Sequence, residues 1–207
     1  MSESVEATKT KILESAKKEF LKNGFTNASL RTIASNADLT TGAMYRHFKD
    51  KDALFCALVD DAIETSKRVI STGSVEFHEN SKENVMGKKH FDEETKIMSD
   101  FLDYIYDHFD AFELLLTKAA GSTHENFVKE MTDLHTENCT ALFAWLKKKF
   151  HVRKEIDKMS IHVISDMIIT SYCEIILHRL EKKAAQKLIT DMSDFFRFGF
   201  MHLLGLK

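Results

Sequence analysis

The chain has 207 residues, 43% of them hydrophobic and 29% charged, with a formal net charge of -3 at pH 7. This composition excludes a disordered polar chain, and the net negative charge excludes a protein that coats nucleic acid indiscriminately. Proline is absent and glycine occurs seven times, so little interrupts long helices, and the sequence predicts an all-α fold.

The first predicted helix runs from about Thr8 to Asn23. Its apolar residues recur at intervals of three and four, which is the period of an amphipathic helix. Gly24 is suited to the left-handed residue that follows a helix, and Phe25 can supply the apolar contact that folds the chain back.

Three more helices are predicted directly after the first. The expected N-cap residues are Ser29, Thr40 and Asp50. They predict short helices over Leu30–Ser35 and Thr41–Phe48 and a fourth helix from Lys51. Two short helices joined by a tight turn within a three-helix cluster form a helix-turn-helix. From Lys22 to Lys51 five basic residues stand against two acidic ones, and this local charge of +3 suits contact with DNA phosphates.

The segment from Ser71 to Lys89 loses the apolar period and is predicted to be the frayed end of the fourth helix and a mobile connection. Amphipathic stretches then resume. They are Asp92–His108, Ala111–Gly121, Thr123–Phe150, Ile156–Glu181 and Ala185–Leu204.

The segment from Leu30 to Phe55 strongly resembles the signature of the TetR family of transcriptional regulators. The matching elements are Gly24-Phe25, Ile33-Ala34, Gly42, Tyr45, Phe48 and Lys51-Asp52-Ala53-Leu54. There are two departures, since Asp38 stands at a turn position that the family usually fills with Gly, and Ala43 stands where Thr is frequent. Asp tolerates a left-handed backbone better than most residues, so we expect the turn to survive.

This resemblance implies two domains. Residues 1–55 would be a helix-turn-helix DNA-binding domain of three helices, and residues 56–207 a helical domain for effector binding and dimerisation. The expected function is that of a sequence-specific transcriptional repressor, released from a palindromic operator by a small-molecule ligand. The alternative is a helical protein-interaction module without specific DNA binding.

The expected DNA contacts come from the helix-turn-helix, whose recognition helix enters the major groove by its N-terminal end. Arg46 is the favoured base reader because its guanidinium can bind guanine bidentately, with a phosphate contact as the alternative. By resemblance, Tyr45 should bind a phosphate, and Lys51 should add charge there. His47 either touches phosphate or packs beside Phe48. The predicted set is Ser29, Arg31, Thr40, Thr41, Gly42, Ala43, Tyr45, Arg46, His47 and Lys51.

The last two predicted helices are unusually apolar, and Ile161–Leu177 is apolar almost all round. A helix of this kind must be buried on several sides. The family resemblance assigns both helices to the four-helix interface of a homodimer, which would hold two recognition helices ~34–36 Å apart. The expected interface residues are Ile164, Ile168, Tyr172, Ile175, Phe196, Phe200 and Leu203.

Aromatic residues are frequent in the middle helices. Core packing accounts for them, but the resemblance also implies a cavity, lined by some of them, for a small apolar or amphipathic effector. The candidate ligand-binding residues are Phe101, Tyr104, Phe112, Phe143 and Tyr172.

No catalytic, cofactor or metal site is predicted. His124-Glu125 and His162 with Asp166 put a histidine near a carboxylate, but neither spacing matches a known metal motif. The sequence also lacks a Gly-rich phosphate loop and a nucleophile elbow. We therefore expect no enzyme.

The cysteines and the N-terminus indicate a cytoplasmic protein without a membrane partner. Cys56, Cys139 and Cys173 are odd in number and far apart, which suits neither disulfides nor a zinc cluster. A redox role stays open for Cys56, which follows two lysines. The acidic, polar N-terminus lacks the features of a secretory signal, and no apolar run approaches the roughly 20 residues that cross a bilayer.

Overall fold

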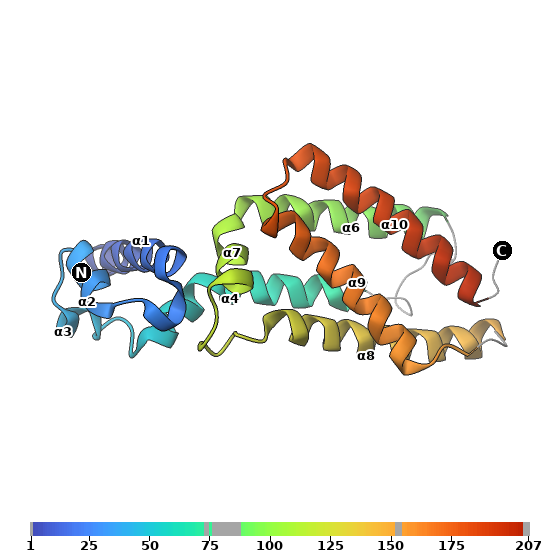
Figure 1. Cartoon of the computed structure of the whole chain (residues 1–207), viewed down its shortest axis with the longest axis horizontal. Helices are drawn as coiled ribbons and strands as arrows, with labels where there is room; N and C mark the ends of the chain where they lie inside the picture. The colour runs from blue at the N-terminus through green and yellow to red at the C-terminus, as the bar shows by residue number, and fades with distance from the viewer. Residues whose placement is uncertain (1, 73–74, 76–87, 152–154, 205–207) are drawn as a thin grey trace. The chain divides into compact units, whose positions relative to one another are not determined.

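The computed structural model describes residues 2–72, 75, 88–151 and 155–204, and within them it shows helices and connections but no strand (Figure 1). The helices are α1 (Ser2–Asn27), α2 (Leu30–Asn36), α3 (Thr41–Met44), α4 (Lys51–Ser71), α6 (Lys88–Asp107), α7 (Phe109–Thr117), α8 (Phe127–Phe150), α9 (Lys158–Leu177) and α10 (Lys182–Leu204). The prediction of an all-α fold is confirmed. Most of the predicted connection between Ser71 and Lys89 lies outside the described residues.

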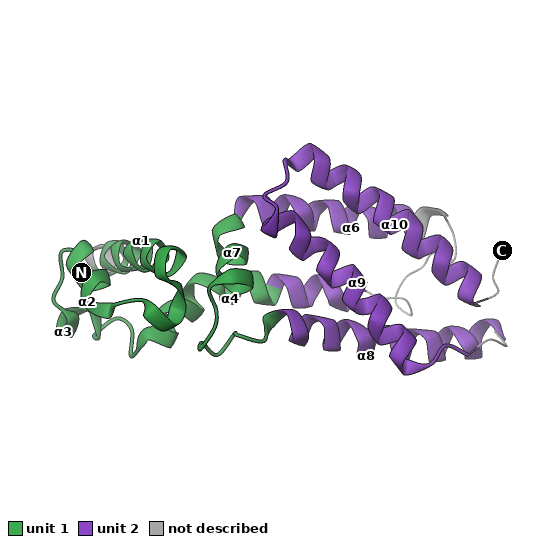
Figure 2. Cartoon of the chain, viewed as in Figure 1, with its two compact units in different colours: residues 1–64, 108–127 green, residues 65–107, 128–207 purple. Residues whose placement is uncertain are grey.

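The chain forms two compact units (Figure 2). The N-terminal unit comprises Met1–Glu64 and His108–Phe127, and the C-terminal unit comprises Thr65–Asp107 and Val128–Lys207. The helix α4 contributes residues to both units. A functional division between residues 55 and 56 stays a prediction, and the segment with α7 belongs with the N-terminal helices.

An aromatic cluster forms the centre of the N-terminal unit. The rings of Phe20, Phe25 and Phe55 pack with centroids 5.3 to 5.9 Å apart, and all three side chains are buried. Gly24 has φ 73° and ψ 165°, which bends α1 just before Phe25. The prediction that this glycine adopts a positive φ and turns Phe25 into the core is confirmed.

The predicted N-caps are confirmed. The side-chain oxygens of Ser29, Thr40 and Asp50 each accept the backbone N–H three residues later, at 3.3, 3.2 and 2.7 Å. Asp38 has φ 58°, so the left-handed turn survives without glycine. The third helix is shorter than predicted, because after Met44 the chain continues as tighter turns.

In the C-terminal unit α10 packs against α6 and α9. Their core contains Leu102, Ile175, Ala185 and Ile189. The hydroxyl of Tyr106 donates to a backbone oxygen in the turn between α9 and α10, at 2.6 Å, which fixes that turn to α6.

The helix α9 is, among the described residues, the one helix that is long and apolar enough to cross a membrane by length and composition. It has 20 residues and a mean hydropathy of 1.4 over its most apolar window. The polar residues His162, Ser165 and Asp166 interrupt its apolar runs, which is why the sequence shows no continuous apolar stretch there. A core helix meets the same criterion, and Ser165 is buried beside His135 of α8.

Candidate nucleic-acid interface

The helices α2 and α3 are held together by an apolar inner face. Ile33, Ala34, Ala37 and Met44 are buried, and the N–H of Leu39 in the turn donates to the carbonyl oxygen of Ala34 at 2.9 Å. The outer face of the two helices therefore keeps its polar side chains toward solvent. This is the arrangement that a helix-turn-helix needs in order to enter a groove of DNA.

None of the ten predicted DNA-contacting residues is buried. The exposed ones are Arg31, Thr40, Gly42, Tyr45 and Arg46, and the half-buried ones are Ser29, Thr41, Ala43, His47 and Lys51. The structure thus brings residues from α2, the turn, α3 and the start of α4 into one unit. Their contacts with DNA stay predictions.

Gly42 illustrates how α3 can approach a duplex. A Cβ atom built on Gly42 would meet no atom of the chain within 4 Å. Packing inside the protein therefore does not require glycine there. A close approach of the α3 backbone to another molecule would explain why this position has no side chain.

Lys51 is engaged inside the protein rather than extended toward solvent. Its Nζ donates to the carbonyl oxygens of Thr26 at 3.0 Å and Ala28 at 3.4 Å, and it lies 4.8 Å from the centre of the Phe25 ring. These contacts close the corner between α1 and α2. The predicted phosphate contact of Lys51 would have to compete with them.

A buried carboxylate that the sequence analysis missed supports the same corner. Glu19 is almost fully buried, and its Oε1 accepts the side-chain N–H of Asn23 at 2.9 Å and the backbone N–H of Ser29 at 3.0 Å. A buried carboxylate is stable only when it is paired in this way. Glu19 therefore fixes the residue that begins α2.

The segment around α7 is bound to α1 by backbone contacts. Phe25 N–H donates to the carbonyl oxygen of Lys118 at 2.8 Å, and the Thr26 hydroxyl donates to that of Ala120 at 2.7 Å. A Cβ on Gly121, which has φ 86°, would lie 2.9 Å from Thr26 Oγ1. This close approach requires glycine, so the sequence around 121 is adapted to holding the N-terminal helices.

The predicted interface residues of α9 and α10 are partly or fully buried within the chain. Ile175 is fully buried in the core of its own unit, and its place at an interface with another chain stays a prediction. Ile164, Ile168, Tyr172, Phe196, Phe200 and Leu203 are half-buried. Neighbouring apolar residues are exposed instead, with between 44% and 67% of their surface accessible. They are Met159, Val163, Met167, Phe195 and Phe198.

The five candidate ligand-binding residues come from both compact units. Phe101 and Tyr172 are in contact, with ring centroids 5.5 Å apart, whereas Phe143 packs on Phe200 at 5.2 Å. Tyr104 is half-buried in α6, and Phe112 is buried in the N-terminal unit.

A buried polar cluster in the C-terminal unit was also missed by the sequence analysis. His135 Nδ1 lies 2.9 Å from Ser165 Oγ and 3.5 Å from the sulfur of Cys139, and burial lowers the pKa of His135 to about 4. Nearby on α8, the hydroxyl of Thr132 is buried without a hydrogen-bond partner among the described residues. Polar atoms in an apolar core are candidates for contact with a bound molecule.

The thiol of Cys56 is mostly protonated at neutral pH. Burial and the charges of Asp52 and Asp60 raise its pKa to about 11, so the nucleophilic thiolate is scarce. Burial likewise raises the pKa of Cys139 to about 12 and that of Cys173 to about 11. The redox role left open for Cys56 stays a prediction.

The geometry of α2, the turn and α3 is that of a helix-turn-helix, and comparison with known proteins shows what this part of the chain is similar to. Residues 12–58 match the bacterial regulatory proteins of the tetR family. The HTH-type transcriptional regulator UidR of Escherichia coli is 36% identical over 59 residues, which are 28% of this chain and 30% of UidR. The HTH-type transcriptional regulator TtgR of Pseudomonas putida is 40% identical over 63 residues, or 30% of each protein. The chain thus covers less than a third of these relatives' length.

Solved structures match over nearly the whole chain. A putative TetR-family transcriptional regulator from Syntrophomonas wolfei is similar, with a TM-score of 0.57 at 18% identity. The match covers 93% of this chain and 96% of the Syntrophomonas wolfei chain. PfmR of Thermus thermophilus, a TetR-family regulator, has a TM-score of 0.58 at 19% identity and covers 95% of both chains. The family match is confined to residues 12–58, and the likeness to the solved structures, at 18% and 19% identity, shows that the chain has the same fold as they do.

Proposed function

We propose that this protein is a sequence-specific DNA-binding transcriptional regulator that represses from a palindromic operator as a homodimer. The main support is the polar surface that α2, the turn and α3 present to solvent, while their apolar residues are buried on the inner face. Arg46 would read a base, Tyr45 would bind a phosphate, and Arg31 would hold the opposite side of the groove. Because it binds chromosomal DNA, the protein would act in the cytoplasm.

The exposed apolar side chains of α9 and α10 support the homodimer. Met159, Val163 and Met167 are spaced four residues apart along one side of α9, and Phe195 and Phe198 are exposed on α10. Covering a large apolar side chain stabilises an assembly by about 1.5–3 kcal/mol. A second copy of the chain that covers these residues would give the two-fold symmetry that a palindromic operator requires.

Release by a small-molecule effector is the second part of the proposal. The polar cluster around His135 and the contact between Phe101 and Tyr172 supply polar and aromatic groups of the kind that bind such ligands. The helix α4 starts at the DNA-binding helices and contributes residues to both units, so a ligand that shifts it would change the spacing of the recognition helices. A 100-fold preference for the released state corresponds to about 2.7 kcal/mol of coupling.

A gel-shift experiment tests the proposal directly. The purified chain is mixed with DNA from its own promoter region, with a scrambled fragment as competitor. A regulator retains the promoter fragment selectively, and an inducer found by thermal-shift screening releases it. Equal retention of both fragments, or none, would favour the alternative of a helical protein-interaction module.

A further inference from the structure

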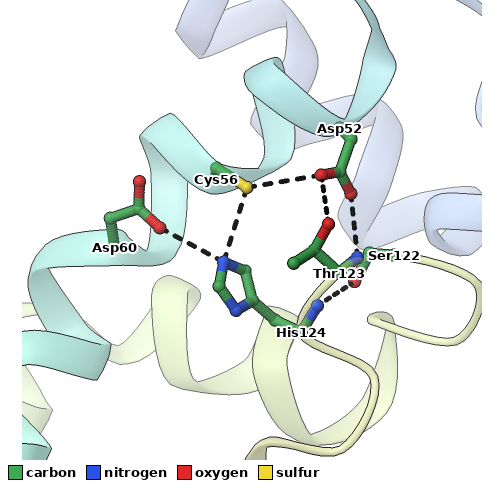
Figure 3. Close-up of polar contacts among 6 residues, drawn as sticks. All are labelled: Asp52, Cys56, Asp60, Ser122, Thr123 and His124. Atoms are coloured by element: carbon green, nitrogen blue, oxygen red, sulfur yellow. Dashed lines mark hydrogen bonds and ion pairs between the residues drawn. The ribbon is translucent and has the colours of Figure 1, made fainter.

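Three potential metal ligands of the N-terminal unit converge beside α4 (Figure 3). Cys56 and Asp60 lie four residues apart and so share one face of the helix. His124 comes from the segment that precedes α8. Its Nε2 lies 3.4 Å from Cys56 Sγ and 3.2 Å from Asp60 Oδ1, and all three ligand atoms lie within 4.8 Å of one another.

The two distances from His124 Nε2 are close to the edges of a tetrahedral zinc site. With Zn–S bonds of ~2.3 Å and Zn–N and Zn–O bonds of ~2.0–2.2 Å, tetrahedral angles separate sulfur from nitrogen by about 3.6 Å and nitrogen from oxygen by about 3.4 Å. The two measured distances differ from these values by about 0.2 Å. A cation can therefore enter between the three atoms with small side-chain movements.

We propose that Cys56, Asp60 and His124 bind a thiophilic divalent cation of the Zn²⁺ type, with a fourth position open to water. A thiol sulfur and an imidazole nitrogen select zinc-like ions over Mg²⁺ and Ca²⁺, which prefer oxygen ligands. On binding, a sulfur–metal bond forms at Cys56 and the thiol proton passes to solvent. Asp60 is largely exposed, which leaves the site accessible to an ion.

Neighbouring contacts orient the histidine toward α4. The two carboxylate oxygens of Asp52 accept the backbone N–H and the hydroxyl of Thr123, at 2.9 and 2.5 Å. The backbone N–H of His124 donates to the Ser122 hydroxyl oxygen at 3.1 Å. These bonds hold the segment before α8 against α4 whether or not an ion is bound. Asp52 is therefore a positioning residue for the site, because it fixes the residue adjacent to His124.

Titration of the full chain with Co²⁺, followed by competition with Zn²⁺, tests the site. Cobalt bound to a thiolate gives a charge-transfer absorption in the near ultraviolet. The wild type should show this band, saturating at about one ion per chain, and Zn²⁺ should remove it. The matched variants Cys139→Ser and Cys173→Ser should keep the band, whereas Cys56→Ser should lose it. Asp52→Asn should weaken cobalt binding by about 10–100-fold.

Two outcomes would overturn the proposal. One is the absence of the thiolate band in the folded wild type, and the other is a band that persists in Cys56→Ser. Circular dichroism checks that each variant folds. If Cys56→Ser does not fold, His124→Gln provides a second variant. That variant should lose tight Co²⁺ binding, and unchanged affinity in it would also count against the site.

Discussion

Replacing Lys51 by methionine separates its internal role from a role at DNA. Lys51→Met keeps the aliphatic stem but removes the ammonium group, and with it the bonds to Thr26 O and Ala28 O and the contact with the Phe25 ring. A charge-assisted hydrogen bond is worth about 1.5–3 kcal/mol, less where water can replace the donor, and an exposed cation–π contact about 0.5–1 kcal/mol. We expect a loss of about 2 kcal/mol of unfolding free energy.

That loss corresponds to a fall in Tm of about 4–8 °C for a chain of this size. Urea and thermal unfolding followed by circular dichroism measure it. Lys49→Met is the matched control, because 82% of the Lys49 side chain is exposed and its one described ion pair is long, at 3.9 Å. It should change stability by less than about 0.5 kcal/mol. The opposite result would be unchanged stability in Lys51→Met and a salt dependence of DNA binding that falls by about one unit. It would show that Lys51 contacts a DNA phosphate instead of stabilising the fold.

Three further predictions concern Gly121, Met167 and His135. Gly121→Ala should lose about 1–3 kcal/mol of unfolding free energy, because of its positive φ and the close Thr26 hydroxyl, whereas Gly42→Ala should fold as well as the wild type. If the chain forms the proposed homodimer, light scattering should show monomers for Met167→Asp and dimers for the control Asp166→Asn. A Met167→Asp variant that remains dimeric would place the interface elsewhere. His135 has a pKa of about 4 in the folded chain and about 6.5 when unfolded, so its contribution is complete above pH 6.5 and is lost as the pH falls toward 4. The wild type should lose about 3 kcal/mol over that range, and the pH dependence should flatten in His135→Gln.

Local signals predicted the N-terminal helices well. The caps at Ser29, Thr40 and Asp50 and the turn at Gly24 each depend on residues within a few positions of one another, so the sequence contains the whole interaction. Helix ends were less accurate. The third helix ends at Met44 because its last turns tighten, which no residue type in that stretch indicates.

Contacts between residues far apart in the sequence could not be predicted from the spacing of residues along the chain. The sulfur of Cys56 lies 3.4 Å from Nε2 of His124, which is 68 residues away, so a search for metal motifs of fixed spacing did not find the cluster. Ile175 and Met167 are both apolar residues of α9, yet Ile175 is buried within the chain and Met167 is exposed. In a helix that is apolar almost all round, the sequence pattern does not distinguish the face that packs internally from the face left for a partner.

Base-by-base DNA binding tests the central claim, that the face formed by α2 and α3 recognises a specific operator. An operator selected from random DNA is substituted one base pair at a time, and the affinities of the wild type and of Arg46→Ala are compared at fixed salt. The wild type should discriminate at several positions, and Arg46→Ala should lose about 1–3 kcal/mol together with the preference at one base pair. If the wild type binds every sequence equally and Arg46→Ala has the same affinities, the face formed by α2 and α3 does not recognise a specific operator.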